Sequence, residues 1–360
     1  KFPALIDSLR SQVDDWRVVV PLDNLTIGKK QRLRVGNVTF SQFSAERVRS
    51  TLARIRAYLL QNPHYMNRPQ FINEYIKDRR KRDVGKLVGT TCAETVIFGR
   101  ADKAYDEALP RIEEAVAGIK LFRYLNDDSY GRYFGIRGSI VTSILRQMLL
   151  YPKGPGFVGS QIERVGTLFE VELDTERMKF MKKNGLREFS EILAKPNRSD
   201  LENRIVSSVL WFGKATDVVL SHKRTSGSTF EVIRPRKRTK LTQAEMMNPY
   251  DRLLKLTVSL ETLLIFDQSE PIRSNLAERV AFVVAKNYSS RKNVVNFVKK
   301  MYAYRSSIVH HGGKGIPPQD LANLMFLTQS VIMWILKNRQ KLKLTSHESL
   351  QEWFEKKKFD

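Results

Sequence analysis

Cysteine, histidine and acidic residues are scarce in this chain of 360 residues. The single cysteine, Cys92, excludes a disulfide framework within the chain and a zinc site built on clustered cysteines. The five histidines leave little for a metal site made of histidine alone, so we expect no metal and no cofactor. The P-loop, the dinucleotide-binding fingerprint, H-E-x-x-H and G-x-S-x-G are also missing, which removes the usual support for P-loop hydrolysis, hydride transfer and metalloprotease chemistry.

Long apolar runs are absent too. The longest uncharged stretch of interest, residues 321–336, includes four polar side chains and is shorter than the roughly 20 apolar residues that span a membrane. No signal-peptide pattern is present at the start of the sequence, and we expect a cytoplasmic protein without membrane contact. A peripheral membrane protein would need a basic amphipathic helix, for which residues 353–358 are the only, short candidate.

Positive charge, by contrast, is in large excess. Sixty-two Lys and Arg against 38 Asp and Glu give a formal charge of +24, which favours a polyanionic partner, nucleic acid before membrane. Three basic runs stand out, within residues 77–86, 234–240 and 286–300. Each run alone is typical of a solvated face, but together they predict an RNA-binding surface. The candidate RNA-binding residues are Arg79, Arg80, Lys81, Arg82, Arg234, Arg236, Lys237, Arg238, Lys240, Lys299 and Lys300.

The residue pattern predicts an α+β protein. Apolar residues at 42% are enough for a core. Period-two patterns predict strands within residues 16–43, with a turn at Gly36–Asn37, and further strands at 91–98 and 167–173. Helical patterns predict helices at 45–60 and 105–125. We therefore expect an N-terminal mixed α/β domain over residues 1–195.

From residue 199 onward the pattern is helical alone, which predicts a bundle over residues 199–340. Ser199 with Glu202 matches a capping box, and Asn275 with Glu278 has the same spacing. Further helices are expected at residues 250–266, 292–310 and from Pro317–Pro318 to 337. A basic insertion loop over residues 222–248 and a basic helical tail over residues 341–360 complete the division.

The strongest local feature is the segment YRSSIVHHGG at residues 304–313. Arg305 precedes His310 by five residues and His311 by six, at the expected end of a helix. A permanently charged arginine beside a histidine suits phosphodiester chemistry, because arginine stabilises charge on a phosphate and histidine moves a proton. The alternative is a surface arginine with a histidine that caps the helix.

Residues 199–337 resemble the HEPN superfamily, in particular its Apea-like branch. The matching pieces are RIVSSVLWFGK at 204–214, LTVSLETLL at 256–264, LAERVAFVVA at 276–285 and YAYRSSIVHHG at 302–312. The last piece matches the R-x4-6-H motif of that family. A weaker match, VVVPLDNL at 18–25, lies in the β-rich region that often precedes this type of HEPN domain.

The resemblance implies a metal-independent endoribonuclease that works as a homodimer and leaves 2′,3′-cyclic phosphate ends. Carried over, Arg305 stabilises the phosphate, either His310 or His311 is the acid/base, and Ser306 and Glu261 are secondary candidates. Glu261 is equally expected to form an ion pair inside the bundle. The resemblance also implies a toxin-like or phage-defence effector, whose N-terminal domain would sense a regulatory protein or phage trigger or guide the substrate. The alternative is a non-catalytic HEPN module that binds nucleic acid or a partner.

Overall fold

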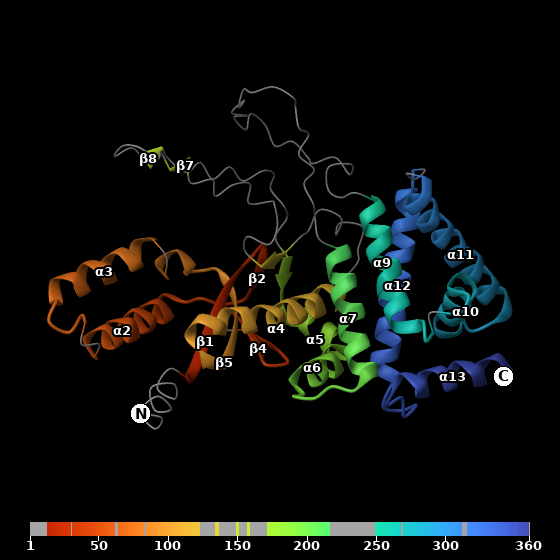
Figure 1. Cartoon of the computed structure of the whole chain (residues 1–360), viewed down its shortest axis with the longest axis horizontal. Coiled ribbons are helices and arrows are strands. Elements are labelled where there is room, and N and C mark those ends of the chain that lie inside the picture. The colour runs from red at the N-terminus through yellow and green to blue at the C-terminus, as the bar shows by residue number, and fades with distance from the viewer. Residues whose placement is uncertain are drawn as a thin grey trace, which may run out of the picture.

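A five-stranded antiparallel sheet forms the N-terminal part of the computed structural model (Figure 1). The structure describes residues 13–29, 31–61, 64–82, 84–122, 134–136, 149–150, 157–158, 171–216, 249–267, 269–311 and 315–359. The strands follow the order β3-β4-β5-β1-β6, with bounds β1 (Val13–Asp23), β3 (Arg32–Val35), β4 (Val38–Gln42), β5 (Thr91–Arg100) and β6 (Gly135–Ile136). Two smaller pairings join β2 (Leu25–Ile27) with β9 (Val171–Leu173) in parallel, and β7 (Leu149–Leu150) with β8 (Phe157–Val158).

The turn between β3 and β4 is the one that the sequence predicts. Gly36 has a φ of 60°, a conformation that costs glycine little. The turn also packs against α6 (Arg187–Ala194), since a Cβ at Gly36 would lie 2.6 Å from that of Leu193. Both local conformation and tertiary contact therefore require glycine here.

Helices make up the rest of the described fold. α2 (Ala45–Gln61) and α3 (Pro69–Arg82) form a hairpin, and a short 3-10 helix, Val84–Leu87, leads into β5. The other helices are α4 (Ala101–Phe122), α5 (Thr175–Met181), the π-helical turn Lys182–Leu186, α6, α7 (Asp200–Ala215), α9 (Pro249–Leu264), α10 (Ile272–Val284), α11 (Tyr288–His311), α12 (Pro318–Asn338) and α13 (His347–Phe359). The predicted α+β class is confirmed.

The helix starts show which local signals hold. Ser199 and Glu202 form the predicted capping box, and α12 begins at Pro318 as expected. The expected start at Asn275 is wrong, because α10 begins at Ile272 and the Asn275 side chain donates to Glu270 instead. The basic loop predicted over residues 222–248 lies wholly outside the described residues.

Helix α4 lies between the sheet and the C-terminal helices (Figure 1). Its buried residues, among them Ile112 and Ile119, belong to one hydrophobic core that also contains Phe40 of the sheet and Phe212 of α7. At the α4–α7 crossing a Cβ on Gly213 would lie 2.9 Å from the Cβ of Ala117, so glycine lets the two helices approach closely. The predicted division near residue 195 stays a prediction, and the core is continuous across it.

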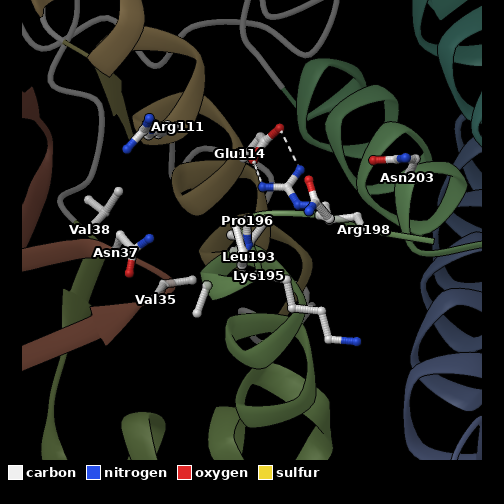
Figure 2. Close-up of a pocket in the computed structure, with 12 residues that line it drawn as sticks. Val35, Asn37, Val38, Arg111, Glu114, Leu193, Lys195, Pro196, Arg198 and Asn203 are labelled. Atoms are coloured by element: carbon white, nitrogen blue, oxygen red, sulfur yellow. Dashed lines mark hydrogen bonds and ion pairs between the residues drawn. The ribbon is translucent and has the colours of Figure 1, made fainter. Parts of the chain in front are cut away.

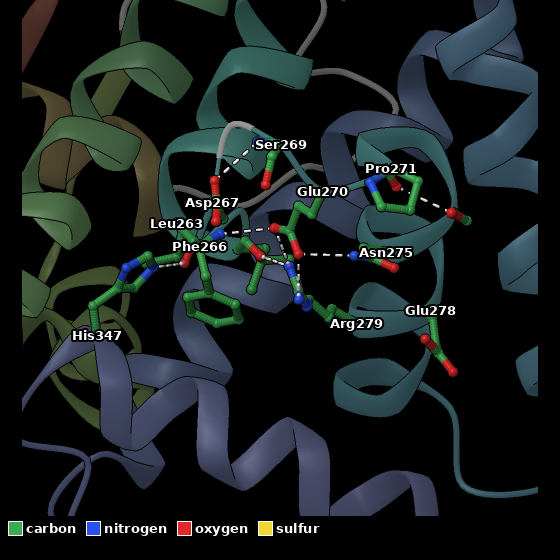
Figure 3. Close-up of polar contacts among 12 residues, drawn as sticks. Leu263, Phe266, Asp267, Ser269, Glu270, Pro271, Asn275, Glu278, Arg279 and His347 are labelled. Atoms are coloured by element: carbon green, nitrogen blue, oxygen red, sulfur yellow. Dashed lines mark hydrogen bonds and ion pairs between the residues drawn. The ribbon is translucent and has the colours of Figure 1, made fainter.

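A buried polar network joins α9, α10 and α13 (Figure 3). Arg279 of α10 makes two contacts with the Glu270 carboxylate, at 2.6 and 2.7 Å, and donates to the Leu264 carbonyl at the end of α9 at 2.7 Å. The Arg279 guanidinium also lies 4.3 Å from the Phe266 ring, whose other neighbour is the His347 ring of α13, with centroids 4.3 Å apart. This network fixes the C-terminal end of α9.

None of the helices in the described ranges has the length and apolar character needed to cross a membrane.

Candidate active site

Helix α11 carries Arg305 and, at its end, His310 and His311. The step of five residues from Arg305 to His310 corresponds to about one and a half turns and about 7.5 Å along the helix axis. The two histidines occupy the last helical turn of α11. Their side chains and Gly312 lie outside the described part of the structure.

Arg305 meets Glu261 of α9 and Tyr302 of its own helix. Arg305 Nη2 lies 3.3 Å from Glu261 Oε2, and Arg305 Nη1 donates to the Tyr302 hydroxyl at 3.2 Å. The guanidinium carbon is 5.1 Å from the Tyr302 ring centre. The Arg305 side chain keeps 28% of its surface exposed and that of Glu261 17%. The guanidinium is thus held on one side and open to solvent on another.

The electrostatics of this cluster favour a cation that is only weakly paired. Burial raises the pKa of Glu261 above its ordinary value, and the positive charge of Arg305 offsets part of that rise. Burial also raises the pKa of Tyr302, helped by the nearby Glu261 carboxylate. Tyr302 therefore stays a neutral hydroxyl beside Arg305.

Two other arginine–carboxylate pairs with little exposed surface are tighter than this one. Arg279 binds Glu270 through two short contacts, and together with other hydrogen bonds this overcomes the effect of burial and holds the Glu270 pKa at about 2. Arg198 binds Glu114 through contacts of 3.0 and 2.7 Å. The Arg305–Glu261 pair has a single long contact, and its carboxylate pKa moves in the opposite direction.

Two buried polar atoms in the same cluster lack a hydrogen-bond partner among the described residues. They are Nε of Arg305 and Oε1 of Glu261. Buried polar groups are nearly always satisfied, and exceptions collect at sites that bind or react. Six further atoms of the described residues share this property, among them Nε of Arg291 and of Arg339, so it makes the Arg305 cluster one candidate site.

The remaining predicted site residues have mixed surroundings. Ser306 is exposed on α11 beside Arg305 and makes no hydrogen bond within the described structure. Sequence reasoning did not single out Tyr302, although its place three residues before Arg305 on a helix brings the two side chains together.

The predicted RNA-binding residues fall into three groups. Arg80 and Lys81 are exposed at the end of α3, Arg79 lies over the Tyr75 ring, and Arg82 is described only as helical backbone. Lys299 is half-buried on α11, and Lys300 is exposed and forms an ion pair of 2.8 Å with Asp320. Arg234, Arg236, Lys237, Arg238 and Lys240 lie outside the described residues.

A separate pocket of about 590 Å³ lies where the β3–β4 turn, α4 and the linker before α7 meet (Figure 2). Its charged lining includes Arg111, Lys195 and the Arg198–Glu114 pair. Histidine, serine, cysteine and tyrosine are absent from the pocket lining, and Lys195 already pairs with Glu202 at 2.6 Å. None of the predicted catalytic residues is among the residues that line this pocket.

Among the described residues, no group of three or more His, Cys, Asp or Glu side chains is arranged to hold a metal ion. No protein-family model, curated protein or solved structure matches this chain. The chemistry of the Arg305 cluster is therefore argued from its own contacts and charges.

Proposed function

We propose that this protein is an endoribonuclease whose catalytic groups are Arg305 and His310, with His311 as the alternative acid/base. The observation that carries the proposal is the weak pairing of Arg305, a half-exposed arginine with one long carboxylate contact and an unpartnered buried Nε. It lies on the helix that ends at the two histidines. The resemblance of the motif segment to HEPN ribonucleases agrees with this chemistry.

In the proposed reaction His310 removes the proton from a ribose 2′-hydroxyl. The 2′-oxygen then forms a bond to the adjacent phosphorus while the bond from phosphorus to the 5′-oxygen breaks. The leaving 5′-oxygen takes up the proton that His310 has removed, directly or through water, which gives a 2′,3′-cyclic phosphate and a 5′-hydroxyl and restores the neutral imidazole. Arg305 stabilises the negative charge that builds on the phosphoryl oxygens.

Arg305 must exchange its partner for this role. The raised pKa of Glu261 shows that this carboxylate gains less from ionisation than a tightly paired one does. A phosphate that approaches the exposed side of Arg305 then competes with a weak ion pair. In this account Glu261 and Tyr302 are positioning residues, which orient the guanidinium without touching the RNA.

Further parts of the proposal rest on the resemblance. We propose a homodimer in which the motif ends of two α11 helices form one active site, in the cytoplasm. The biological role that fits is a regulated toxin or phage-defence effector, under control of a protein or phage trigger. Expression of the wild type and Arg305→Ala in a bacterial host, with growth and plaque counts, tests that role.

Cleavage of total RNA and tRNA in EDTA tests the catalytic assignment. We expect Arg305→Ala to lose at least about a hundredfold of the rate. His310→Ala should lose about a hundredfold to ten-thousandfold, and His311→Ala little. Arg273→Ala is the matched control, because it removes the same charge from an exposed position on α10. Equal losses in the control and in Arg305→Ala would show a general charge effect and contradict the assignment.

A second candidate function is a non-catalytic module that binds nucleic acid or a partner protein. The observation in its favour is that Arg305 already has an intramolecular carboxylate partner, as a structural arginine does. It predicts that Arg305→Ala and His310→Ala keep full function, whereas charge reversal at Arg236, Lys237 and Arg238 removes it. The endoribonuclease proposal predicts instead that the Arg305 and His310 variants lose more function than the charge-reversal variant.

A further inference from the structure

The α2–α3 hairpin carries a row of aromatic rings that the proposed catalytic site does not use. Tyr65, in the turn before α3, stacks on Phe71 with ring centres 5.5 Å apart and planes within 10°. The ring centres of Phe71 and Tyr75 are 6.0 Å apart, and the Arg79 guanidinium lies 5.0 Å from the Tyr75 ring centre. Tyr65, Phe71, Tyr75 and Arg79 are called the aromatic row below.

The aromatic row is not the interior of the hairpin. The interior side of α3 is formed by Ile72, which is 1% exposed, and by Ile76, which packs on a small cluster with Phe43, Val48 and Leu52. Phe71 precedes Ile72 by one residue, so it lies on a neighbouring face of the helix. The Phe71 side chain is 43% exposed. The hairpin thus has a core of its own and keeps a ring on its surface.

Positive charge surrounds the row. Residues 45–82 contain ten Lys and Arg against three Asp and Glu. On α3 the side chains of Lys77, Arg80 and Lys81 are exposed and form no ion pair within the described structure. The exposed Phe71 side chain, which extends a stack of rings beside unpaired cations, fits a ligand that has flat bases and phosphates.

The hairpin also lies apart from the Arg305 site. Figure 1 shows α2 and α3 at one end of the molecule and α10 and α11 at the other. A ligand held on the hairpin therefore contacts a surface that is distinct from the motif end of α11. Such a site would act on affinity and not on the chemical step.

We propose that the α2–α3 hairpin binds single-stranded RNA, with bases stacked on the aromatic row and phosphates on Lys77, Arg80 and Lys81. Stacking on aromatic side chains accepts every base, and cations along the row follow the backbone. The choice of RNA rests on the proposed function, while the aromatic row and its charge do not. A membrane surface fits less well, because exposed Asn73, Glu74 and Asp78 interrupt the apolar face that insertion needs.

Fluorescence anisotropy with a labelled 20-nucleotide oligouridine tests this site. The full chain is used with Arg305→Ala as background, in EDTA, so that bound RNA is not cut. The double variant Phe71→Leu/Tyr75→Leu keeps apolar bulk and therefore the fold, but removes the ring faces. We expect its Kd to rise at least about tenfold. Phe71→Tyr should bind as the background protein does.

Phe326→Leu is the matched control, since this phenylalanine is exposed on α12, outside the hairpin. An unchanged Kd in the double variant, or the same rise in the control, overturns the proposal. The proposal is also overturned if the full chain binds anionic vesicles but not oligouridine and loses this vesicle binding in the double variant. Arg80→Glu/Lys81→Glu provides a second test that leaves the apolar side chains intact, and it should weaken binding further at low salt.

The outcomes for this site and for the proposed function are separable. If the protein binds oligouridine through the aromatic row but does not cleave RNA, the endoribonuclease proposal is refuted and the hairpin site is retained. If the protein cleaves RNA in EDTA and the double variant binds oligouridine with unchanged affinity, only the hairpin proposal is refuted. If RNA binds at the hairpin, the KM for RNA cleavage should rise in the Phe71→Leu/Tyr75→Leu variant, while kcat stays unchanged.

Discussion

Arg305 and Arg279 are two arginines with a glutamate partner, and their surroundings give them different roles. Arg279 is 3% exposed, and its partner Glu270 accepts hydrogen bonds from three groups. Arg305 has a carboxylate partner that is buried without comparable donors and whose pKa is raised. The first arginine has the contacts of a structural bridge, whereas the proposed function requires the second to exchange its partner.

Neutralising Glu261 should therefore strengthen the binding of phosphate at Arg305. In Glu261→Gln one negative charge beside the phosphate site is removed, and a charge at about 4 Å in a water-rich setting is worth about 1 kcal/mol. We expect the Kd for RNA to fall about fivefold and cleavage to persist. Glu355→Gln, an equal charge change on α13, is the control, and an equal gain there would contradict a local effect.

At the scale of elements, the joint between α9 and α10 positions the Arg305 cluster. Arg279 holds the last carbonyl of α9, and Glu261 lies one turn earlier on that helix. Phe266, between Arg279 and His347, ties α13 to the same joint. The orientation of Glu261 toward Arg305 therefore depends on residues that touch neither side chain.

The contacts at the joint between α9 and α10 make the free energy of unfolding depend on pH. The pKa of Glu270 is about 2 in the folded chain, below its ordinary value of 4.5, so its contribution is complete above pH 4.5 and disappears as pH falls toward 2. Glu270→Gln leaves Arg279 buried without its ion partner, which should cost about 3 kcal/mol at neutral pH. Urea unfolding should show this difference shrinking between pH 4.5 and 2.

Burial lowers the pKa of His347 and so adds a second acid-dependent contribution, which is lost as pH falls below the ordinary value of 6.5. Glu191→Gln is the control for the joint, because its pair with Arg187 is exposed and should be worth less than about 1 kcal/mol. A difference between wild type and Glu270→Gln that does not change with pH would contradict the account.

Local signals predicted much of the secondary structure, whereas side-chain contacts across one turn and a basic run in one helix account for the exceptions. The Gly36–Asn37 turn and the Ser199 capping box depend on neighbours in sequence, and both were correct. The start at Asn275 was wrong because Glu270 and Arg279 form a tertiary pair around that turn. Helix α3 was not predicted, because its basic run hides the apolar spacing of Ile72 and Ile76.

The candidate site was predictable in part for the same reason. The spacing of Arg305, His310 and His311 is local, and an ion pair of Glu261 within the bundle was one of the two expected roles. That role matches the contact with Arg305, although the two residues are 44 positions apart. Tyr302 and the aromatic row were missed, but the four-residue spacing of Phe71, Tyr75 and Arg79 would indicate the row once a helix is assigned.

At the scale of the whole molecule, the sheet and the bundle share one core. Gly213 of α7 meets Ala117 of α4, and Gln329 of α12 donates to the Leu121 carbonyl at the end of α4. Figure 1 shows α4 beside α7, between the sheet and the later helices. The α2–α3 hairpin, with its separate small cluster, is the part that packs more independently.

The shared core predicts that the bundle does not fold alone. A chain of residues 196–360 would expose the α7 surface that packs on α4, and a domain needs its own closed core. We expect such a chain to lack a cooperative urea transition and a dispersed NMR spectrum, in contrast to the full chain. A cooperative transition with native-like dispersion would contradict this and support a domain boundary near residue 195.

The central claim is that Arg305 acts on a phosphodiester through ribose 2′-hydroxyl attack. The most direct measurement is the end chemistry of RNA cut by the full chain in EDTA, compared between wild type and Arg305→Ala. The account predicts 2′,3′-cyclic phosphate and 5′-hydroxyl ends with the wild type, and their loss in Arg305→Ala. Products with 3′-hydroxyl ends, or cyclic ends that Arg305→Ala forms at the wild-type rate, would contradict it.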